Sequence, residues 1–212
     1  ISAAKKEFIE FMMSADVLRF GEFKTKSGRL SPYFVNTGNY KTGSQIATLG
    51  KFYAQCIMDE CGDNFDAMFG PAYKGIPLAT SAAGSLARDF GVDKPYFFNR
   101  KEAKDALLNA AKVTVPDMFI SVNRCEVGQT PGKTAVMEVK EQFGINVHAI
   151  ITVADIHEYL KTKPEYASVL TNMERYMEQY CILNSLALPT GTQDFLVCLF
   201  FLLPLLHLLP AL

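Results

Sequence analysis

The sequence FDAMFGPAYKG (residues 65–75) holds the step from strand to helix on which the predicted fold depends. Its first five residues are mostly apolar, as expected of a strand buried on both faces, and Gly70 with Pro71 ends that strand. A helix is predicted from Ile76 to Phe90, and its many small residues allow close packing on a sheet. This segment therefore predicts a strand, a tight loop and a covering helix.

The same alternation continues in both directions along the chain. Helices are predicted at residues 3–18, 44–61, 76–90, 106–112, 134–143, 155–161 and 164–180. Strands are predicted at residues 20–23, 31–36, 65–69, 94–99, 117–123 and 147–153. Strands that alternate with helices indicate an α/β fold with a mostly parallel sheet flanked by helices. Ligand sites in such sheets lie beyond the carboxyl ends of the strands.

Composition sets the broad class. The chain has 212 residues, of which 49% are hydrophobic and 20% charged, as in an ordinary globular domain. Its formal net charge of −1 offers no overall basic field, so no nucleic acid is expected as a partner. The charged start, Lys5-Lys6-Glu7, is unlike a signal peptide. A cytoplasmic protein is expected.

The cysteines and histidines carry no spacing of a metal site. Five cysteines are scattered without a C-x-x-C pair, so reduced thiols are expected rather than a zinc site or disulfides. Three histidines, His148, His157 and His207, lack metal-ligand spacing. No metal ligands are predicted from the sequence.

The composition changes after Tyr180, which divides the chain into a domain at 1–182 and an apolar, Leu- and Phe-rich tail at 183–212. Residues 195–212 have no formal charge, and a helix of that length would span ~27 Å, near the thickness of a bilayer core. Pro204 would kink such a helix, and the lack of a basic flank disfavours membrane contact through 195–212. The alternatives are an appendage packed on the domain or a partner, and a segment of aberrant coding origin.

Several cations lie near strand ends and together suggest a polyanionic ligand. Lys74 lies in the loop after the strand predicted at residues 65–69, where the free N–H groups at the start of the next helix favour the binding of a phosphate. An ordinary loop with a solvated lysine is the alternative. The other cations are Lys26, Arg29, Arg100, Lys101 and Lys104.

The segment GQTPGKT (residues 128–134) resembles a phosphate-binding P-loop but has the wrong spacing. Three residues separate its glycines where the P-loop requires four. We therefore predict a simple turn before a helix.

Three motifs in order resemble those of orotate phosphoribosyltransferases: FKTKSGRLSPYF (residues 23–34), GPAYKGIPLA (residues 70–79) and NRKEAKD (residues 99–105). The resemblance extends from Ala3 to Tyr180 and implies a type I phosphoribosyltransferase fold. It implies transfer of a phosphoribosyl group from 5-phosphoribosyl-1-diphosphate to orotate, giving orotidine 5′-phosphate in pyrimidine synthesis. It also implies Mg²⁺, carried by the donor, and a homodimer.

The resemblance also implies roles for individual residues. Arg124 matches an arginine that grips the carboxylate of orotate, which suits a planar guanidinium. Phe34 and Val35 stand where the family holds the orotate ring. The expected donor-binding residues are Lys26, Tyr73, Lys74, Arg100, Lys101 and Lys104.

The chain departs from the family after Asp105, which is followed at once by Ala106 and a predicted helix. The family has a mobile loop with a histidine there, and then a strand that ends in paired aspartates. No apolar run in this chain ends in Asp-Asp, so no catalytic residue is identified. We predict an internal deletion of one strand-loop-helix unit, on the order of thirty residues. The expected sheet lacks a central strand, and impaired activity is expected.

Other readings of this chain remain open. It could be a non-catalytic variant that binds orotate or another anion, a membrane-tethered protein, or the product of wrongly joined coding segments.

Overall fold

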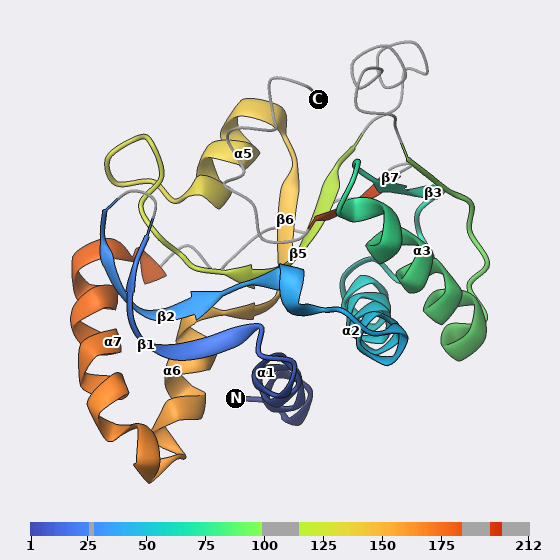
Figure 1. Cartoon of the computed structure of the whole chain (residues 1–212). Coiled ribbons are helices and arrows are strands. Elements are labelled where there is room, and N and C mark those ends of the chain that lie inside the picture. The colour runs from blue at the N-terminus through green and yellow to red at the C-terminus, as the bar shows by residue number, and fades with distance from the viewer. Residues whose placement is uncertain (26–27, 99–114, 184–195, 201–212) are drawn as a thin grey trace.

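The computed structural model describes residues 1–25, 28–98, 115–183 and 196–200. Its core is a parallel sheet with the strand order β4-β3-β7-β5-β6 (Figure 1). These strands are β3 (Ala67–Gly70), β4 (Tyr96–Phe98), β5 (Asp117–Asn123), β6 (Asn146–Thr152) and β7 (Leu196–Phe200). A separate antiparallel hairpin is formed by β1 (Leu18–Lys24) and β2 (Leu30–Val35). The predicted α/β class with a mostly parallel sheet is confirmed.

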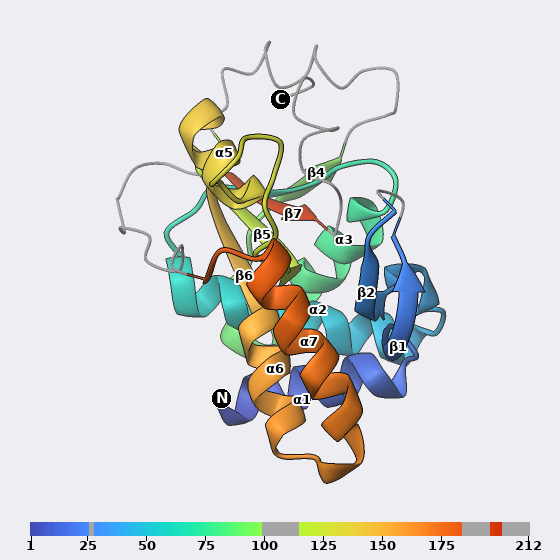
Figure 2. The same cartoon turned by 90° about the vertical axis from the view of Figure 1, so that its left-hand side faces the viewer.

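Helices cover both faces of this sheet. Helices α1, α2 and α3 pack on one face, α5 packs on the other, α7 packs on β2 of the hairpin, and α6 packs on α7 and α1 (Figures 1 and 2). The helices are α1 (Ala3–Ser14), α2 (Gly43–Cys61), α3 (Gly75–Ser85), α5 (Ala135–Phe143), α6 (Val153–Lys161) and α7 (Ala167–Tyr180). Shorter helical turns are η1 (Thr37–Asn39), the π-helical η2 (Leu86–Phe90) and η3 (Pro164–Tyr166).

Strand β5 shows why a continuous apolar run forms a central strand. Successive side chains of a strand point to opposite faces. Phe119 joins the large core cluster that includes α1, α2 and α3, whereas Met118 and Ile120 join a smaller cluster with α5. Both faces are buried, so the strand needs apolar residues throughout.

The central position of the sheet is occupied by β7, which comes from the predicted tail. Its register pairs Leu196 with Ala67 of β3 and Val197 with Asp117 of β5, both in parallel. Without it, the facing edges of β3 and β5 would leave their backbone N–H and C=O groups unpaired. The sheet therefore has a strand at the place where the sequence predicted a missing one.

This arrangement corrects part of the expectation for the tail. A helix over 195–212 is wrong for residues 196–200, which pair as a strand because two open strand edges offer partners. Those five residues form a strand inside the sheet. The division of the chain at residue 182 stays a prediction. Within the described residues, no helix is both long and apolar enough to cross a membrane.

Most helix boundaries agree with the sequence because capping residues fix them. Thr42 accepts a hydrogen bond from the N–H of Gln45 at the start of α2, and the Gln45 side chain returns a contact to the cap, forming a capping box. The first helix is shorter than predicted. It ends at Ser14, after which Asp16 takes a left-handed φ of 57° and the chain enters β1. The helix predicted at 106–112 lies outside the described residues.

Candidate functional site

The candidate site lies at the carboxyl ends of the parallel strands, as predicted for this class of sheet. Strand β3 leads into the loop with Tyr73 and Lys74, and β5 leads into Arg124. One strand, β7, separates β3 from β5. Adjacent strands lie ~4.8 Å apart, so the two strand ends are on the order of 10 Å from each other. That separation suits a ligand with two recognition points.

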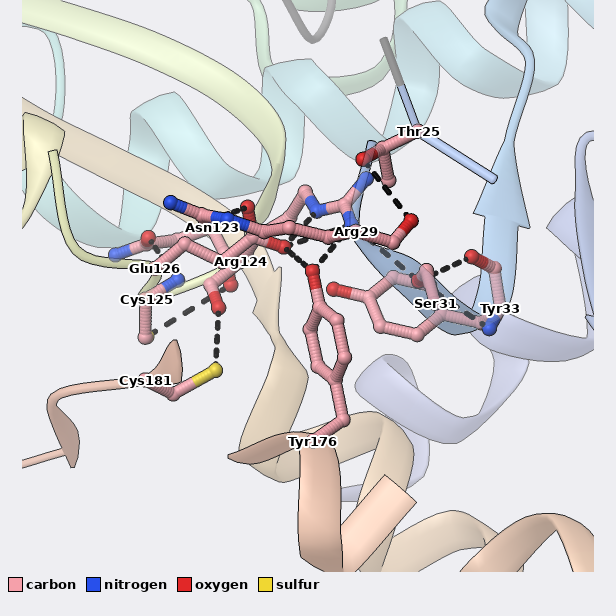
Figure 3. Close-up of polar contacts among 10 residues, drawn as sticks. All are labelled: Thr25, Arg29, Ser31, Tyr33, Asn123, Arg124, Cys125, Glu126, Tyr176 and Cys181. Carbon is pink, nitrogen blue, oxygen red and sulfur yellow. Dashed lines mark hydrogen bonds and ion pairs between the residues drawn. The ribbon is translucent and has the colours of Figure 1, made fainter. Parts of the chain in front are cut away.

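Arg124 is held in a network between the hairpin and α7 (Figure 3). Its Nε donates to Glu126 Oε1 at 2.7 Å, and its Nη2 donates to the hydroxyl of Tyr176 at 3.3 Å. Its Cζ lies 4.7 Å from the ring centre of Tyr33 on β2, a cation–π contact. The side chain of Arg124 is 21% exposed. The network fixes the guanidinium while leaving an edge open to a ligand.

Glu126 is the shared acceptor of this network. The Tyr176 hydroxyl donates to its Oε1 at 2.6 Å, and Arg29 Nη1 lies 3.7 Å from its Oε2. Burial and the bond to Glu126 raise the pKa of Tyr176 to about 12, so its hydroxyl keeps the proton that it donates. Burial alone would lower the pKa of Arg124, but Tyr33, Glu126 and Tyr176 outweigh it and raise that pKa. Arg124 is therefore a permanent cation.

A cleft of 450 Å³ opens beside this network, between the hairpin and α7. Ser31 and Tyr176 line it and also contact Arg124. Arg29 and Arg175 line it as well. Guanidinium groups bind carboxylates and phosphates through paired hydrogen bonds, so the cleft suits a small anion.

Phe34 and Val35 lie on the hairpin, but on different faces of β2. Ser31 and Tyr33 are buried toward Arg124, whereas Phe34 is 42% exposed and stacks on Phe23 with ring centres 5.4 Å apart. Val35 is half-buried and packs on the large core cluster. The structure therefore brings Arg124 to Ser31 and Tyr33, and it places Phe34 on the opposite face of the strand. Roles for Phe34 and Val35 in orotate binding stay predictions.

The Tyr73–Lys74 loop is tight and exposed. A Cβ added at Gly70 would lie 2.4 Å from the carbonyl oxygen of Gly75, so only glycine allows this close approach of β3 to α3. Tyr73 is 68% exposed, and Lys74, directly before α3, is exposed as well. Both side chains are open to a ligand. The remaining predicted donor contacts, Lys26, Arg100, Lys101 and Lys104, lie outside the described residues.

The P-loop-like segment at 128–134 is a turn, as predicted. Gly128 N–H donates to the carbonyl of Lys133 at 2.8 Å, and Thr134 caps α5 by accepting from Met137 N–H. The carboxylate of Glu138 accepts the N–H groups of Gln129 and Thr130. Backbone donors that a phosphate would use are thus taken by the protein itself.

Comparison with known proteins identifies the family. No model of a protein family matches the chain. The curated orotate phosphoribosyltransferase of Yersinia enterocolitica is 42% identical over 214 residues, which cover 85% of this chain and 99% of that protein. The Yersinia pestis protein of the same name is 41% identical, with coverage of 85% and 98%. This chain belongs to the orotate phosphoribosyltransferase family.

Solved structures agree with this family. The orotate phosphoribosyltransferase of Francisella tularensis superposes with a TM-score of 0.76 at 32% identity, covering 83% of this chain and all of that one. The UMP synthase of Leishmania donovani shares the fold at 15% identity, with a TM-score of 0.63 over 82% of this chain and 42% of its own.

The alignment lengths reveal a gap in this family member. Since 85% of 212 residues is about 180, an alignment of 214 positions leaves 214 − 180, or about 34, where the Yersinia enterocolitica protein has residues and this chain has none. That length agrees with the predicted deletion of one strand-loop-helix unit, on the order of thirty residues. Its position after Asp105 stays a prediction.

Some site residues of this orotate phosphoribosyltransferase homologue were not found from the sequence. Glu126, Tyr176 and Tyr33 hold Arg124. Glu126 is two residues from Arg124 and Tyr33 lies in the first family motif, but Tyr176 is 52 residues away from Arg124 and belongs to no motif. Only the fold brings the hairpin, the end of β5 and α7 together. The role of these neighbours in holding Arg124 therefore becomes visible only in the fold.

Proposed function

We propose that this chain is an orotate phosphoribosyltransferase with an intact acceptor half-site and impaired turnover. The main support for the acceptor half-site is Arg124, a permanent cation that is held at the carboxyl end of β5 beside a cleft large enough for a small anion. Orotate is a planar carboxylate, and a preorganised guanidinium can bind such a group through two parallel hydrogen bonds. Phe34 and Val35 complete the acceptor side in this proposal.

The donor side is proposed to begin at Tyr73 and Lys74. Lys74 offers an exposed ammonium to the diphosphate of 5-phosphoribosyl-1-diphosphate, and Tyr73 offers a hydroxyl. Lys26, Arg100, Lys101 and Lys104 are proposed to add further cations. Positive charge there would stabilise the pyrophosphate as it leaves, while the ribose carbon gains positive charge.

Impaired turnover follows from the strand between the two half-sites. In the family, by resemblance, a strand ending in paired aspartates holds the ribose hydroxyls of the donor. Here β7 has the sequence LVCLF (Leu196–Phe200), and the chain continues FLLP at 201–204. No carboxylate follows that strand in the sequence, so the ribose lacks these acceptors.

Mg²⁺ is proposed to enter with the donor. The carboxylate nearest to Arg124 is that of Glu126, and it is already engaged by two arginines and a tyrosine. The described residues around Arg124 therefore do not fit a resident magnesium site. The phosphate oxygens of the donor can hold the ion themselves.

A homodimer is proposed as well. Large apolar side chains are exposed on the hairpin and at the carboxyl ends of strands, among them Leu30 at 69% and Phe98 at 50%. Exposed apolar surface of this kind favours association. Size-exclusion chromatography with light scattering should give twice the chain mass of 23.5 kDa. A mass of one chain at micromolar concentration would contradict the dimer.

Two measurements test the proposed function. Calorimetry with orotate should show binding that Arg124→Gln weakens at least tenfold, while Arg88→Gln, a change at an exposed arginine paired with Asp89, leaves it unchanged. A coupled assay of orotidine 5′-phosphate should give a turnover far below the ~10 s⁻¹ of a typical enzyme. Absent orotate binding would overturn the acceptor site, and full turnover would overturn the impairment.

A further inference from the structure

A second polar cluster lies at the opposite, amino end of the parallel sheet. Cys61 is the last residue of α2, Asp117 is the first residue of β5, and His148 is near the start of β6. One ligand atom from each of these three residues lies within 4.8 Å of the others. The cluster is distinct from the site at Arg124, because parallel strands place their amino and carboxyl ends at opposite edges.

The ring of His148 is oriented as metal-binding imidazoles are. Its Nδ1 lies 3.0 Å from Glu60 Oε2, so a carboxylate accepts from that nitrogen. Its Nε2 lies 2.8 Å from Asp117 Oδ1, the carboxylate of the cluster. Metal-ligating histidines almost always donate their other ring N–H to such an acceptor, which fixes the tautomer and the ring direction. Phe119 stacks on the same ring, with centres 4.8 Å apart, and holds its plane.

Asp117 is positioned in the same way. Asn146 donates to its Oδ1 at 3.0 Å, and Lys140 in turn donates to the Asn146 side chain at 2.7 Å. The side chains of Asp117 and His148 are only 9% and 14% exposed, while Cys61 is half-buried at the edge of the large core cluster. The imidazole and carboxylate are therefore preformed, and the half-buried thiol is the least enclosed of the three ligands.

We propose that Cys61, Asp117 and His148 form a site for a zinc-type divalent ion. Thiolate, imidazole and carboxylate together suit Zn²⁺, whereas Mg²⁺ and Ca²⁺ prefer oxygen ligands alone. With metal–ligand bonds of ~2.0–2.3 Å, the ligand atoms of a tetrahedral site lie ~3.3–3.7 Å from one another. On binding the ion, the longest distances between the three ligand atoms would therefore shorten by about 1 Å, and His148 Nε2 would move slightly away from Asp117. Three protein ligands leave the fourth position to water.

The spacing along the chain could not reveal this site. Its ligands stand at positions 61, 117 and 148, and no two lie within one helical turn or loop. The site arises because α2 ends beside the first residues of two adjacent parallel strands.

The test is a cobalt titration of the metal-free full chain. Co²⁺ should bind with one equivalent and give a near-ultraviolet band from thiolate-to-cobalt charge transfer, and Zn²⁺ should displace it. Cys61→Ser should abolish the band. His148→Gln should weaken binding at least tenfold, and Glu60→Gln, which only orients the ring, about tenfold. Zn²⁺ should raise the melting temperature of the wild-type chain but not of Cys61→Ser.

The matched control is Cys56→Ser, a second half-buried thiol on the same helix and outside the cluster. This variant should keep the band and the affinity. Melting curves of the metal-free variants report whether each one folds, and His148→Gln and Glu60→Gln test the site even if Cys61→Ser does not fold. The proposal is overturned if the wild-type chain gives no thiolate band, or if Cys61→Ser keeps it.

Discussion

A chain that ends at Leu183 should lose most of its stability, because it lacks β7. This strand forms three residue pairs with β3 and four with β5. Parallel pairing gives roughly one backbone hydrogen bond for each residue pair, and each bond contributes about 0.5–1.5 kcal/mol net. The loss is thus roughly 4–10 kcal/mol, against a total stability of ~5–15 kcal/mol for a typical domain.

Urea denaturation followed by circular dichroism measures this loss, and size-exclusion chromatography shows whether the exposed edges of β3 and β5 associate. The shortened chain should have a much lower midpoint, or form oligomers. A control chain that ends at Phe200 keeps β7 and should retain the midpoint of the full chain. If the chain ending at Leu183 stays monomeric with an unchanged midpoint, β7 is not a structural strand and the reasoning fails.

Three further predictions concern the loop carboxylate, the helix contact and the gap. Glu138→Gln should lower the free energy of unfolding by ~1–2 kcal/mol near neutral pH. Burial alone would raise the pKa of Glu138, but the hydrogen bonds that its carboxylate accepts from Thr130 and Gln129 outweigh burial and lower that pKa from 4.5. Because the folded pKa is the lower one, this stabilisation is complete above the unfolded pKa of about 4.5 and is lost as the pH falls from there through the folded pKa. The difference between the two chains in urea titrations should shrink and then vanish over that range, and a constant difference would contradict this. Gly50→Ala should lower the stability measured by thermal melting by ~1–3 kcal/mol, because the new Cβ would lie 2.7 Å from the Ser81 backbone. The control Gly84→Ala places its Cβ in open space, so it should lose no stability through packing. Inserting the roughly 34-residue segment of the Yersinia enterocolitica protein after Asp105 should raise turnover at least 100-fold; unchanged turnover of a folded chain would refute the assigned position of the gap.

The regular elements could be predicted from the sequence because local patterns determine them. Strand β5 was placed at residues 117–123 as observed, since a seven-residue run that is mostly apolar fits a strand buried on both faces. The helical spacing of apolar residues predicts a start at residue 44, one residue from the observed start of α2 at Gly43, where Thr42 and Gln45 form a capping box.

Strand β7 could not be predicted in this way. A run of leucines and phenylalanines fits a helix or a strand equally well, and the sequence interpretation considered only a helix, as a disfavoured membrane anchor. What decides the outcome for Leu196–Phe200 is the pair of open edges on β3 and β5, which are far away in the sequence. Strand pairing of this kind is a property of the fold rather than of the segment.

In the candidate site, too, some residues could be predicted from the sequence and others depend on the fold. Arg124 was found because it matches a family motif, whereas Glu126 and Tyr176, which orient it, were not found. The cluster of Cys61, Asp117 and His148 was also invisible, because its members share an edge of the sheet but no sequence spacing. Motifs reveal residues that meet a ligand, and they rarely reveal the neighbours that hold those residues in place.

The central place of β7 also sets an order of events during synthesis. Its partners β3 and β5 leave the ribosome first, and the chain must grow by 73 further residues from Asn123 to Leu196 before the strand between them exists. At ~5–20 residues per second, this takes roughly 4–15 s. During that time the two inner edges stay open to other chains, so a chaperone or slow synthesis bears directly on the yield of folded protein. The middle strand of the sheet is thus the last of the described strands to be made.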